Sequence, residues 1–402
     1  MNSPTSAGAR TDELKRAAIG HIDRITPVLV ELSHRIHATP ELAFAEYQAV
    51  RTLIGVARAE GLTIEPSAYG LETAFAVDFG SSLSPKVAII SEYDALPDVG
   101  HACAHNLIAA IGLGAALALH TLIDRLPGSI RYLGAPAEER GCGKELLARE
   151  GAFEGVDAAM MVHPASWDLK AVRTACIAEV SVVFTGHASH AAVKPEAGRN
   201  ALDAAVLSYQ AIAQLRQHIR DKERVHGVIT EGGGAPNVVL GRAACHYFVR
   251  AANARELGDL KARVEACFHG AAQASGCTAE VRWADADYLD MRVNEPLADA
   301  YEANATLLGR EFTPYEQFPA GGTDMANVSH HVPVLHPTIA CAPPDVMIHE
   351  PEFAAWAASK RGEQALADGA KALAMTAIDF LQDQTLRRRT QAAFASAHVP
   401  AA

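Results

Sequence analysis

The stretch Ser91-Glu-Tyr-Asp-Ala-Leu-Pro-Asp-Val-Gly-His-Ala-Cys-Ala-His-Asn106 is the part of the sequence from which the fold can best be read. The apolar run 87–90 precedes it and predicts a buried strand, and the Ala- and Leu-rich run 107–122 that follows is long enough for a helix. A segment between a strand and a helix lies at the carboxyl end of the strand, where open α/β sheets place their sites. The sequence therefore predicts an α/β fold with a site in this stretch.

Two side chains in this stretch, Cys103 and His105, have the spacing of two ligands of one metal ion. On extended or turn backbone, residues two apart point to the same side, whereas on a helix they diverge. We therefore expect both on the loop before the helix, with Asn106 as the helix N-cap. Taken alone, the pair fits a buried cysteine among core histidines equally well.

Acids and imidazoles at later strand ends and loops favour the metal. Glu138 and Glu139 follow a predicted strand on a Gly-rich exit, where adjacent carboxylates point to different sides, so one can bind a metal while the other faces a water. His163 follows a predicted buried strand, and His349 lies in a polar loop. Each also has a simpler interpretation, because a Glu-Glu pair is commonly a solvated turn and a loop histidine is commonly just exposed.

Composition excludes several classes of protein. A chain of 402 residues with 49% hydrophobic and 20% charged residues suggests two globular domains. A net charge of -12 argues against nucleic-acid binding. No apolar run is expected to reach the length of a membrane span, and the N-terminus lacks the apolar core of a signal peptide. Seven scattered cysteines are typical of the reducing cytoplasm, where we expect the protein to act without a membrane.

The order of predicted elements divides the chain into two domains. Residues 177–289 read strand, helix, strand, strand, helix, strand, which is the ferredoxin-like order. Residues 11–176 and 290–385 instead alternate strands and helices, ending in a helix over 352–380. We expect an α/β catalytic domain with an inserted α+β domain that has no metal-ligand cluster of its own. Residues 387–402 are expected to be frayed.

The chain contains a series of short motifs, which occur in this order: His37-Ala-Thr-Pro-Glu41-Leu, Glu92-Tyr-Asp-Ala-Leu-Pro, His101-Ala-Cys-Ala-His105, Pro136-Ala-Glu-Glu139, Gly186-His-Ala-Ser-His190-Ala, Gly198-Arg-Asn-Ala201, Pro236-Asn-Val-Val239, Gly321-Gly-Thr-Asp324 and His349-Glu-Pro-Glu-Phe353. Together they resemble the clan MH aminoacylase/carboxypeptidase family of dinuclear metallohydrolases. The resemblance is to the amidohydrolase branch that holds hippurate hydrolase, indole-acetyl-amino-acid hydrolase and aminobenzoyl-glutamate hydrolase. It implies a mixed-sheet, aminopeptidase-like catalytic domain with an inserted lid and dimerisation domain.

The resemblance also implies a metal centre. Two divalent ions would share the Cys103 thiolate and be held by Cys103, His105, Glu139, His163 and His349. Imidazole, carboxylate and thiolate donors suit zinc and tolerate manganese or cobalt.

Further roles follow from the resemblance. Glu138 would be the general base and acid, with Asp94 supporting the site from behind the ligands. His190 would reach the active site of the partner subunit in a homodimer formed through the lid domain, and there help bind the substrate or the oxyanion. Asn237 and Arg250 match lid positions that hold the substrate carboxylate.

Two positions depart from the branch pattern. Ala104 replaces a glycine between Cys103 and His105, and would be strained if the backbone there needs a positive φ. Arg140 also stands where the branch commonly has glycine, and adds a positive charge beside the site.

The expected function is metal-dependent hydrolysis of the amide bond of an N-acyl or N-aroyl amino acid, or of a small dipeptide, to a carboxylic acid and a free amino acid. Within the branch the sequence looks most like aminobenzoyl-glutamate hydrolases and the β-alanyl-lysine type of dipeptidase. One alternative is a catalytically silent binding or scaffold member of the same fold. Another is a cysteine hydrolase with Cys103 as nucleophile and His105 as base, although two residues apart on one loop is poor geometry for that pair.

Overall fold

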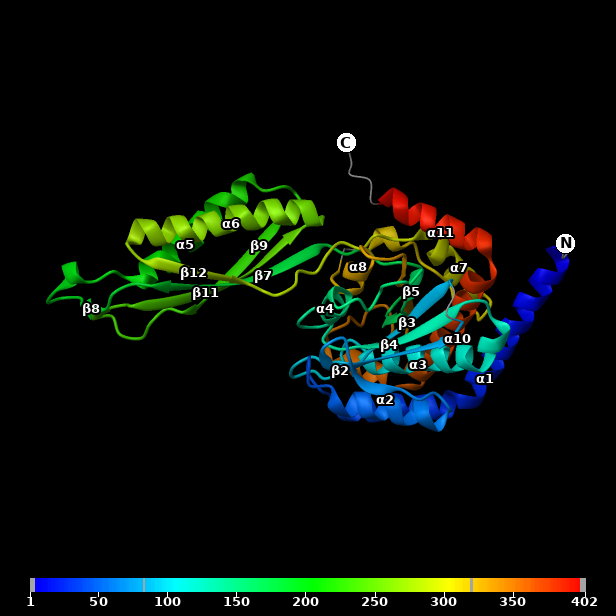
Figure 1. Cartoon of the computed structure of the whole chain (residues 1–402). Helices are drawn as coiled ribbons and strands as arrows, with labels where there is room; N and C mark the ends of the chain where they lie inside the picture. The colour runs from blue at the N-terminus through cyan, green and yellow to red at the C-terminus, as the bar shows by residue number, and fades with distance from the viewer. Residues whose placement is uncertain (1–3, 82–83, 319–320, 398–402) are drawn as a thin grey trace. The chain divides into compact units, whose positions relative to one another are not determined.

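The computed structural model describes residues 4–81, 84–318 and 321–397, and its chain forms two compact units (Figure 1). The larger unit comprises Met1–Arg173 and Met291–Ala402, and the inserted unit comprises Thr174–Asp290.

A six-stranded mixed sheet forms the centre of the larger unit. Its last four strands run parallel and its first two pair antiparallel. In sheet order the strands are β1 (Glu65–Ala68), β2 (Leu71–Gly80), β4 (Ser129–Ala135), β3 (Lys86–Glu92), β5 (Ala158–Met160) and β13 (Val334–Leu335). A separate parallel pair consists of β6 (His163–Ala165) and β14 (Thr338–Ala340). The expected mixed α/β sheet is confirmed, and β1 is a strand that the sequence did not indicate.

Helices cover both faces of this sheet. Because side chains alternate along a strand, Val87 and Ile89 of β3 lie in one core and Ala88 and Ile90 in the other. The first core also contains residues of α1 (Pro4–Ala38), α2 (Tyr47–Ala59), α3 (His105–Leu122) and α10 (Lys360–Gln382). The second contains residues of α4 (Gly143–Arg149) and α8 (Met325–Val328).

The helix α3 is unusually apolar. The segment His105–Arg125 is long and apolar enough to cross a membrane by length and composition, so the expectation that no run approaches that length was wrong. In the structure, 83% of its apolar window is buried inside the fold. Its composition is therefore explained by its place between the sheet and the helices α1 and α10.

The C-terminal region is more ordered than the sequence suggested. The expected single helix over 352–380 is two helices, α9 (Pro351–Ala357) and α10, because Ser359 caps a new helix by accepting the N–H of Gly362. The expected fraying from residue 387 was also wrong as far as residue 397. There α11 (Gln384–Ala397) is fixed by the Asn294 side chain, which donates to the Thr390 carbonyl at 2.9 Å. Residues 398–402 lie outside the described residues.

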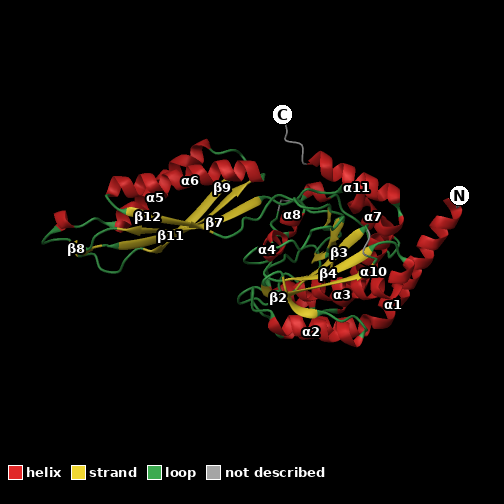
Figure 2. Cartoon of the chain, in the orientation of Figure 1, coloured by secondary structure: helices red, strands yellow, loops and turns green. Residues whose placement is uncertain are grey.

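The inserted unit is an antiparallel four-stranded sheet with two helices on one face (Figure 2). Its elements in chain order are β7 (Cys176–Thr185), α5 (Ala201–Leu215), β9 (Arg224–Glu231), β11 (Arg242–Ala251), α6 (Ala254–Ser275) and β12 (Thr278–Trp283). This is the predicted order of strands and helices. A small ribbon pairs β8 (Ser189–His190) with β10 (Val238–Val239).

The remaining elements are one helix of the larger unit and four short 3-10 turns. They are α7 (Glu295–Thr306), η1 (Ile123–Arg125), η2 (Pro195–Ala197), η3 (Arg216–His218) and η4 (Tyr315–Gln317).

Candidate metal centre

The candidate site lies where two neighbouring parallel strands, β3 and β4, end at the same edge of the sheet. Residues 93–104 connect β3 to α3 and are called the first loop here. Residues 136–142 connect β4 to α4 and are called the second loop. Both loops therefore begin side by side, which brings segments distant in sequence to one place.

The first loop enters its helix through a left-handed residue. Ala104 has φ 58° and ψ 32° and occupies the N-cap position of α3. This is the positive φ at which alanine was expected to be strained. The expectation that Asn106 caps the helix was wrong, because the helix already begins at His105. The Asn106 amide instead donates to the Ser33 hydroxyl at 2.8 Å and to the Ala357 carbonyl at 3.3 Å.

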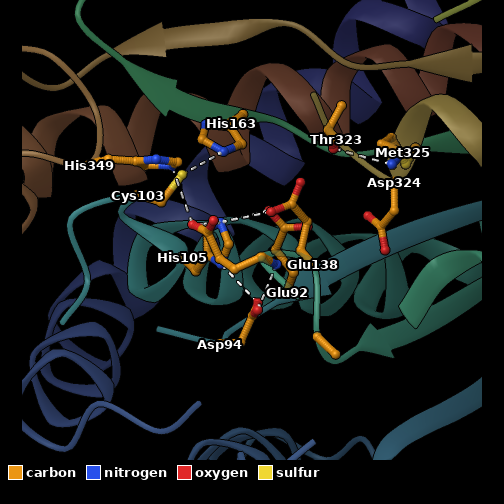
Figure 3. Close-up of polar contacts among 12 residues, drawn as sticks. Glu92, Asp94, Cys103, His105, Glu138, His163, Thr323, Asp324, Met325 and His349 are labelled. Carbon is orange, nitrogen blue, oxygen red and sulfur yellow. Dashed lines mark hydrogen bonds and ion pairs between the residues drawn. The ribbon is translucent and has the colours of Figure 1, made fainter. Parts of the chain in front are cut away.

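The predicted ligand side chains come together in space (Figure 3). Their ligand atoms form three groups within which all atoms lie no more than 4.8 Å apart. The groups are Cys103, His105 and His163; Cys103, Glu139 and His349; and His105, Glu138 and Glu139. Within them, Cys103 Sγ lies 3.6 Å from His163 Nε2, and Glu139 Oε1 lies 3.6 Å from His349 Nε2. Cys103, His105 and Glu139 each belong to two groups, and Cys103 is the one of them grouped with both His163 and His349.

Two of the imidazoles are oriented by acceptors on their other nitrogen. His105 Nδ1 lies 3.0 Å from Asp94 Oδ1, and His163 Nδ1 lies 2.6 Å from the Pro164 carbonyl. Each Nδ1 is thus placed to donate, so each Nε2 faces the cluster and is an acceptor when its ring is neutral. Asp94 also accepts the backbone N–H of Glu139 at 2.9 Å, so it fixes parts of both loops.

The donor set fits a bound cation. Glu139 Oε1 and His105 Nε2 are buried and make no hydrogen bond. Buried acceptors without a donor are costly, and a positive ion between them would remove that cost. Because the set combines imidazole, carboxylate and thiol, it suits zinc and related divalent ions.

Burial and the neighbouring charged groups shift the pKa values of the side chains in the cluster. Burial raises the pKa of Cys103 and of Glu138 well above their ordinary values, and nearby carboxylates raise both further. Burial alone would lower the pKa of His105, but Glu92 and Cys103 raise it well above its ordinary value. Burial lowers the pKa of His163 to about 4. The protonated forms of Cys103 and His105 are thus favoured, and a cation must displace those protons.

His349 is tied to the first loop by its backbone. Its side chain is 51% exposed, in line with the simpler interpretation of a loop histidine. However, its N–H donates to the Ala102 carbonyl at 2.8 Å, and its φ is 72°. This strained backbone brings the imidazole beside Glu139.

Three buried residues beside the cluster were given no role from the sequence. The Lys144 ammonium contacts Glu92 Oε2 and lies 2.6 Å from Asp324 Oδ1, and all three side chains are fully buried. The other oxygen of Glu92 lies 3.3 Å from His105 Nε2. Glu92 and Asp324 stand inside the quoted motifs, which was the one available signal, whereas Lys144 looked like an ordinary helix residue.

The predicted lid residues lie on the inserted unit. His190 pairs with Val238 between β8 and β10, and the Ala191 N–H donates to the Asn237 carbonyl at 3.0 Å, so His190 and Asn237 are neighbours on an exposed ribbon. Arg250 is next to the last residue of β11, roughly 27 Å along that strand from its first residue, Arg242. Within one chain the three residues therefore do not form a single cluster.

Comparison with known proteins gives the family. The model of peptidase family M20/M25/M40 matches residues 88–379. The chain belongs to this peptidase family. It is 38% identical to the Xaa-Arg dipeptidase of Mus musculus, over 94% of this chain and 91% of that protein. It is 28% identical to a p-aminobenzoyl-glutamate hydrolase component of Escherichia coli, over 90% of each chain. The expected amidohydrolase branch and enzyme class are confirmed.

Solved structures of M20 relatives share the fold. An aminobenzoyl-glutamate utilization protein from Klebsiella pneumoniae matches with a TM-score of 0.74 at 18% identity, covering 91% of this chain and 98% of that one. A Bacillus subtilis protein described as a dinuclear metal-binding peptidase of the M20 family matches with a TM-score of 0.66 at 21% identity, covering 89% and 99%.

Proposed function

We propose that this M20 chain is a metal-dependent amidohydrolase of N-acyl or N-aroyl amino acids or small dipeptides, releasing a carboxylic acid and a free amino acid. The observation that carries the proposal is the pair of buried acceptors without donors, His105 Nε2 and Glu139 Oε1, inside the ligand cluster. The named relatives, a dipeptidase and an aminobenzoyl-glutamate hydrolase, support the substrate class.

The cluster would hold two divalent ions, zinc or manganese, with cobalt also tolerated. The ligands would be the five residues expected from the sequence, with Cys103 as the shared donor because it is grouped with both His163 and His349. When bound, such a pair of ions polarises an amide carbonyl and lowers the pKa of water.

Glu138 would move the protons of the reaction. It is buried beside Glu139, and its raised pKa allows its carboxyl to hold a proton near neutral pH. It would take a proton from the attacking water and deliver it to the amide nitrogen. Delivery is needed because an amide anion is a very poor leaving group. Asp94 keeps His105 and Glu139 in place during these steps.

The inserted unit would act as the lid and as the dimer contact. His190 and Asn237 lie on an exposed ribbon, as residues that reach the active site of a partner subunit must. Arg250 would bind the substrate carboxylate from its separate position on β11. Mixing chains that carry His190→Ala with chains that carry Glu138→Gln tests this arrangement. Mixed dimers regain activity if His190 acts on the partner's site, and stay inactive if it acts within its own chain.

The function is tested by screening N-acyl amino acids and dipeptides with the metal-loaded protein and identifying products by mass. Chelation should abolish turnover, and added zinc or manganese should restore it. Turnover that survives chelation would instead support Cys103 as a nucleophile. A protein that binds metal but cleaves no member of the panel would support the binding or scaffold alternative.

A further inference from the structure

Glu92, the last residue of β3, is held from two sides by the first turns of two helices. Its Oε2 contacts the ammonium of Lys144 in α4, and its Oε1 lies 3.3 Å from Nε2 of His105 in α3. The Glu92 side chain is fully buried, and Oε1 makes no hydrogen bond.

In the neutral form of His105, which is the form that binds a metal, its Nε2 and the Glu92 oxygen are two acceptors face to face. Asp94 occupies Nδ1 of His105, so a neutral imidazole keeps its proton there and presents a lone pair at Nε2. That lone pair and the Glu92 oxygen both need a positive charge. Two ligands at about 2.0–2.1 Å from a tetrahedral zinc ion lie about 3.4 Å apart, which is close to the observed separation.

We propose that Glu92 is a further donor to the cation held by His105, and that Lys144 is the positioning residue that aims it. The inference rests on the proposed metal centre and extends its ligand set beyond the residues expected from the sequence. Lys144 binds the oxygen that faces away from His105, and this leaves Oε1 directed at the cation. Asp324 in turn holds Lys144, accepting from its ammonium at 2.6 Å and from its backbone N–H at 2.8 Å.

The test compares Glu92→Gln with Asp324→Asn in the full chain. Each substitution removes one charged acceptor from the same buried lysine, but only Glu92 faces His105. Zinc is titrated into metal-free protein by calorimetry. Glu92→Gln should weaken one of two zinc equivalents by about 10- to 100-fold or more, and Asp324→Asn, which acts on Glu92 only through the lysine, should weaken it by clearly less.

Each other result is decisive. Equal losses in both variants would mean that Glu92 acts only through the lysine, and an unchanged Glu92→Gln would mean that it does not act on the metal; either overturns the inference. A parent protein that binds fewer than two zinc ions would overturn the proposed function itself.

A measurement on the parent protein covers the case in which a variant does not fold. In crystals grown with zinc, a Glu92 oxygen should lie about 2.0–2.2 Å from an ion. An ion bound by His105 with Glu92 beyond contact distance would overturn the inference and leave the proposed function intact.

Discussion

The two loops at the edge of the sheet share one backbone design but deliver different chemistry. Each follows a parallel strand and enters a helix through a left-handed residue, Ala104 with φ 58° in the first loop and Cys142 with φ 57° in the second. The first helical turns then present His105 and Lys144, and both side chains reach Glu92.

The difference lies in what each side chain can exchange. An imidazole can give up a proton for a metal ion, whereas the pKa of Lys144 is raised by Asp324 and Glu92 against the effect of burial, so it stays charged. The comparison teaches that the turn geometry sets the position of the first helical turn, and that a residue in that turn decides between a ligand and a fixed charge.

The largest effect on turnover should come from Glu138→Gln, which removes the proton carrier of the second loop without changing a metal ligand. The second loop would lose its proton carrier while the ligands stay, so kcat should fall by about 10²- to 10⁴-fold with metal content unchanged. Steady-state kinetics and elemental analysis check this. Full activity in the variant would remove Glu138 from the mechanism.

The two cysteines give a matched pair of variants. Cys103 belongs to two ligand groups, whereas Cys142 belongs to none of the groups found among the described residues. Cys103→Ser should lower zinc affinity by more than about 100-fold, because loss of a residue that only hydrogen-bonds to a ligand already costs up to about 100-fold. Cys142→Ser should leave zinc affinity unchanged. Competition with a chromophoric chelator measures both. Similar affinities would show that the loops do not differ as described.

A smaller effect is expected for Asp94→Asn, which alters the support of both loops. The amide keeps a similar shape but loses the charge that orients His105, so zinc affinity should fall by about 10- to 100-fold. Zinc titration checks the affinity, and circular dichroism provides the folding control.

The smallest effect concerns Glu46, which supports only the second loop. Its carboxylate accepts the N–H groups of Phe44 and Ala137, and burial raises its pKa from 4.5 to about 7. Between these values the folded state holds more protons than the unfolded state, so stability falls as pH rises. Relative to Glu46→Gln, the parent should lose at most about 1.4 kcal/mol per pH unit from 4.5 to 7. Denaturant unfolding across this range measures the difference, and parallel curves would contradict the assignment.

Local patterns predicted the elements better than the contacts between them. The apolar run 87–90 and the Cys103–His105 spacing predicted a strand end with metal-capable side chains, because these depend on nearby residues. The contacts of Lys144 with Glu92 and Asp324 join positions 52 and 180 residues apart, and no local pattern encodes them.

The errors of prediction have specific causes. Asn favours N-caps in general, but at Asn106 tertiary hydrogen bonds to Ser33 and Ala357 outweighed that preference. Residues 387–402 were expected to be frayed as the last residues of the sequence, yet buried Leu386 and Thr390 help to dock α11. The exposed His349 could be assigned to the site only through its motif, since a loop position alone predicts no neighbours.

The complete burial of Lys144 has a practical consequence. Amine-acylating reagents modify lysines that solvent can reach, so they should leave this one untouched in the native protein. The rate at which the peptide with acylated Lys144 appears in peptide maps would then report how often the first turn of α4 opens to solvent. Acylation of this one side chain would thus measure local opening at the edge of the sheet where the ligand cluster lies.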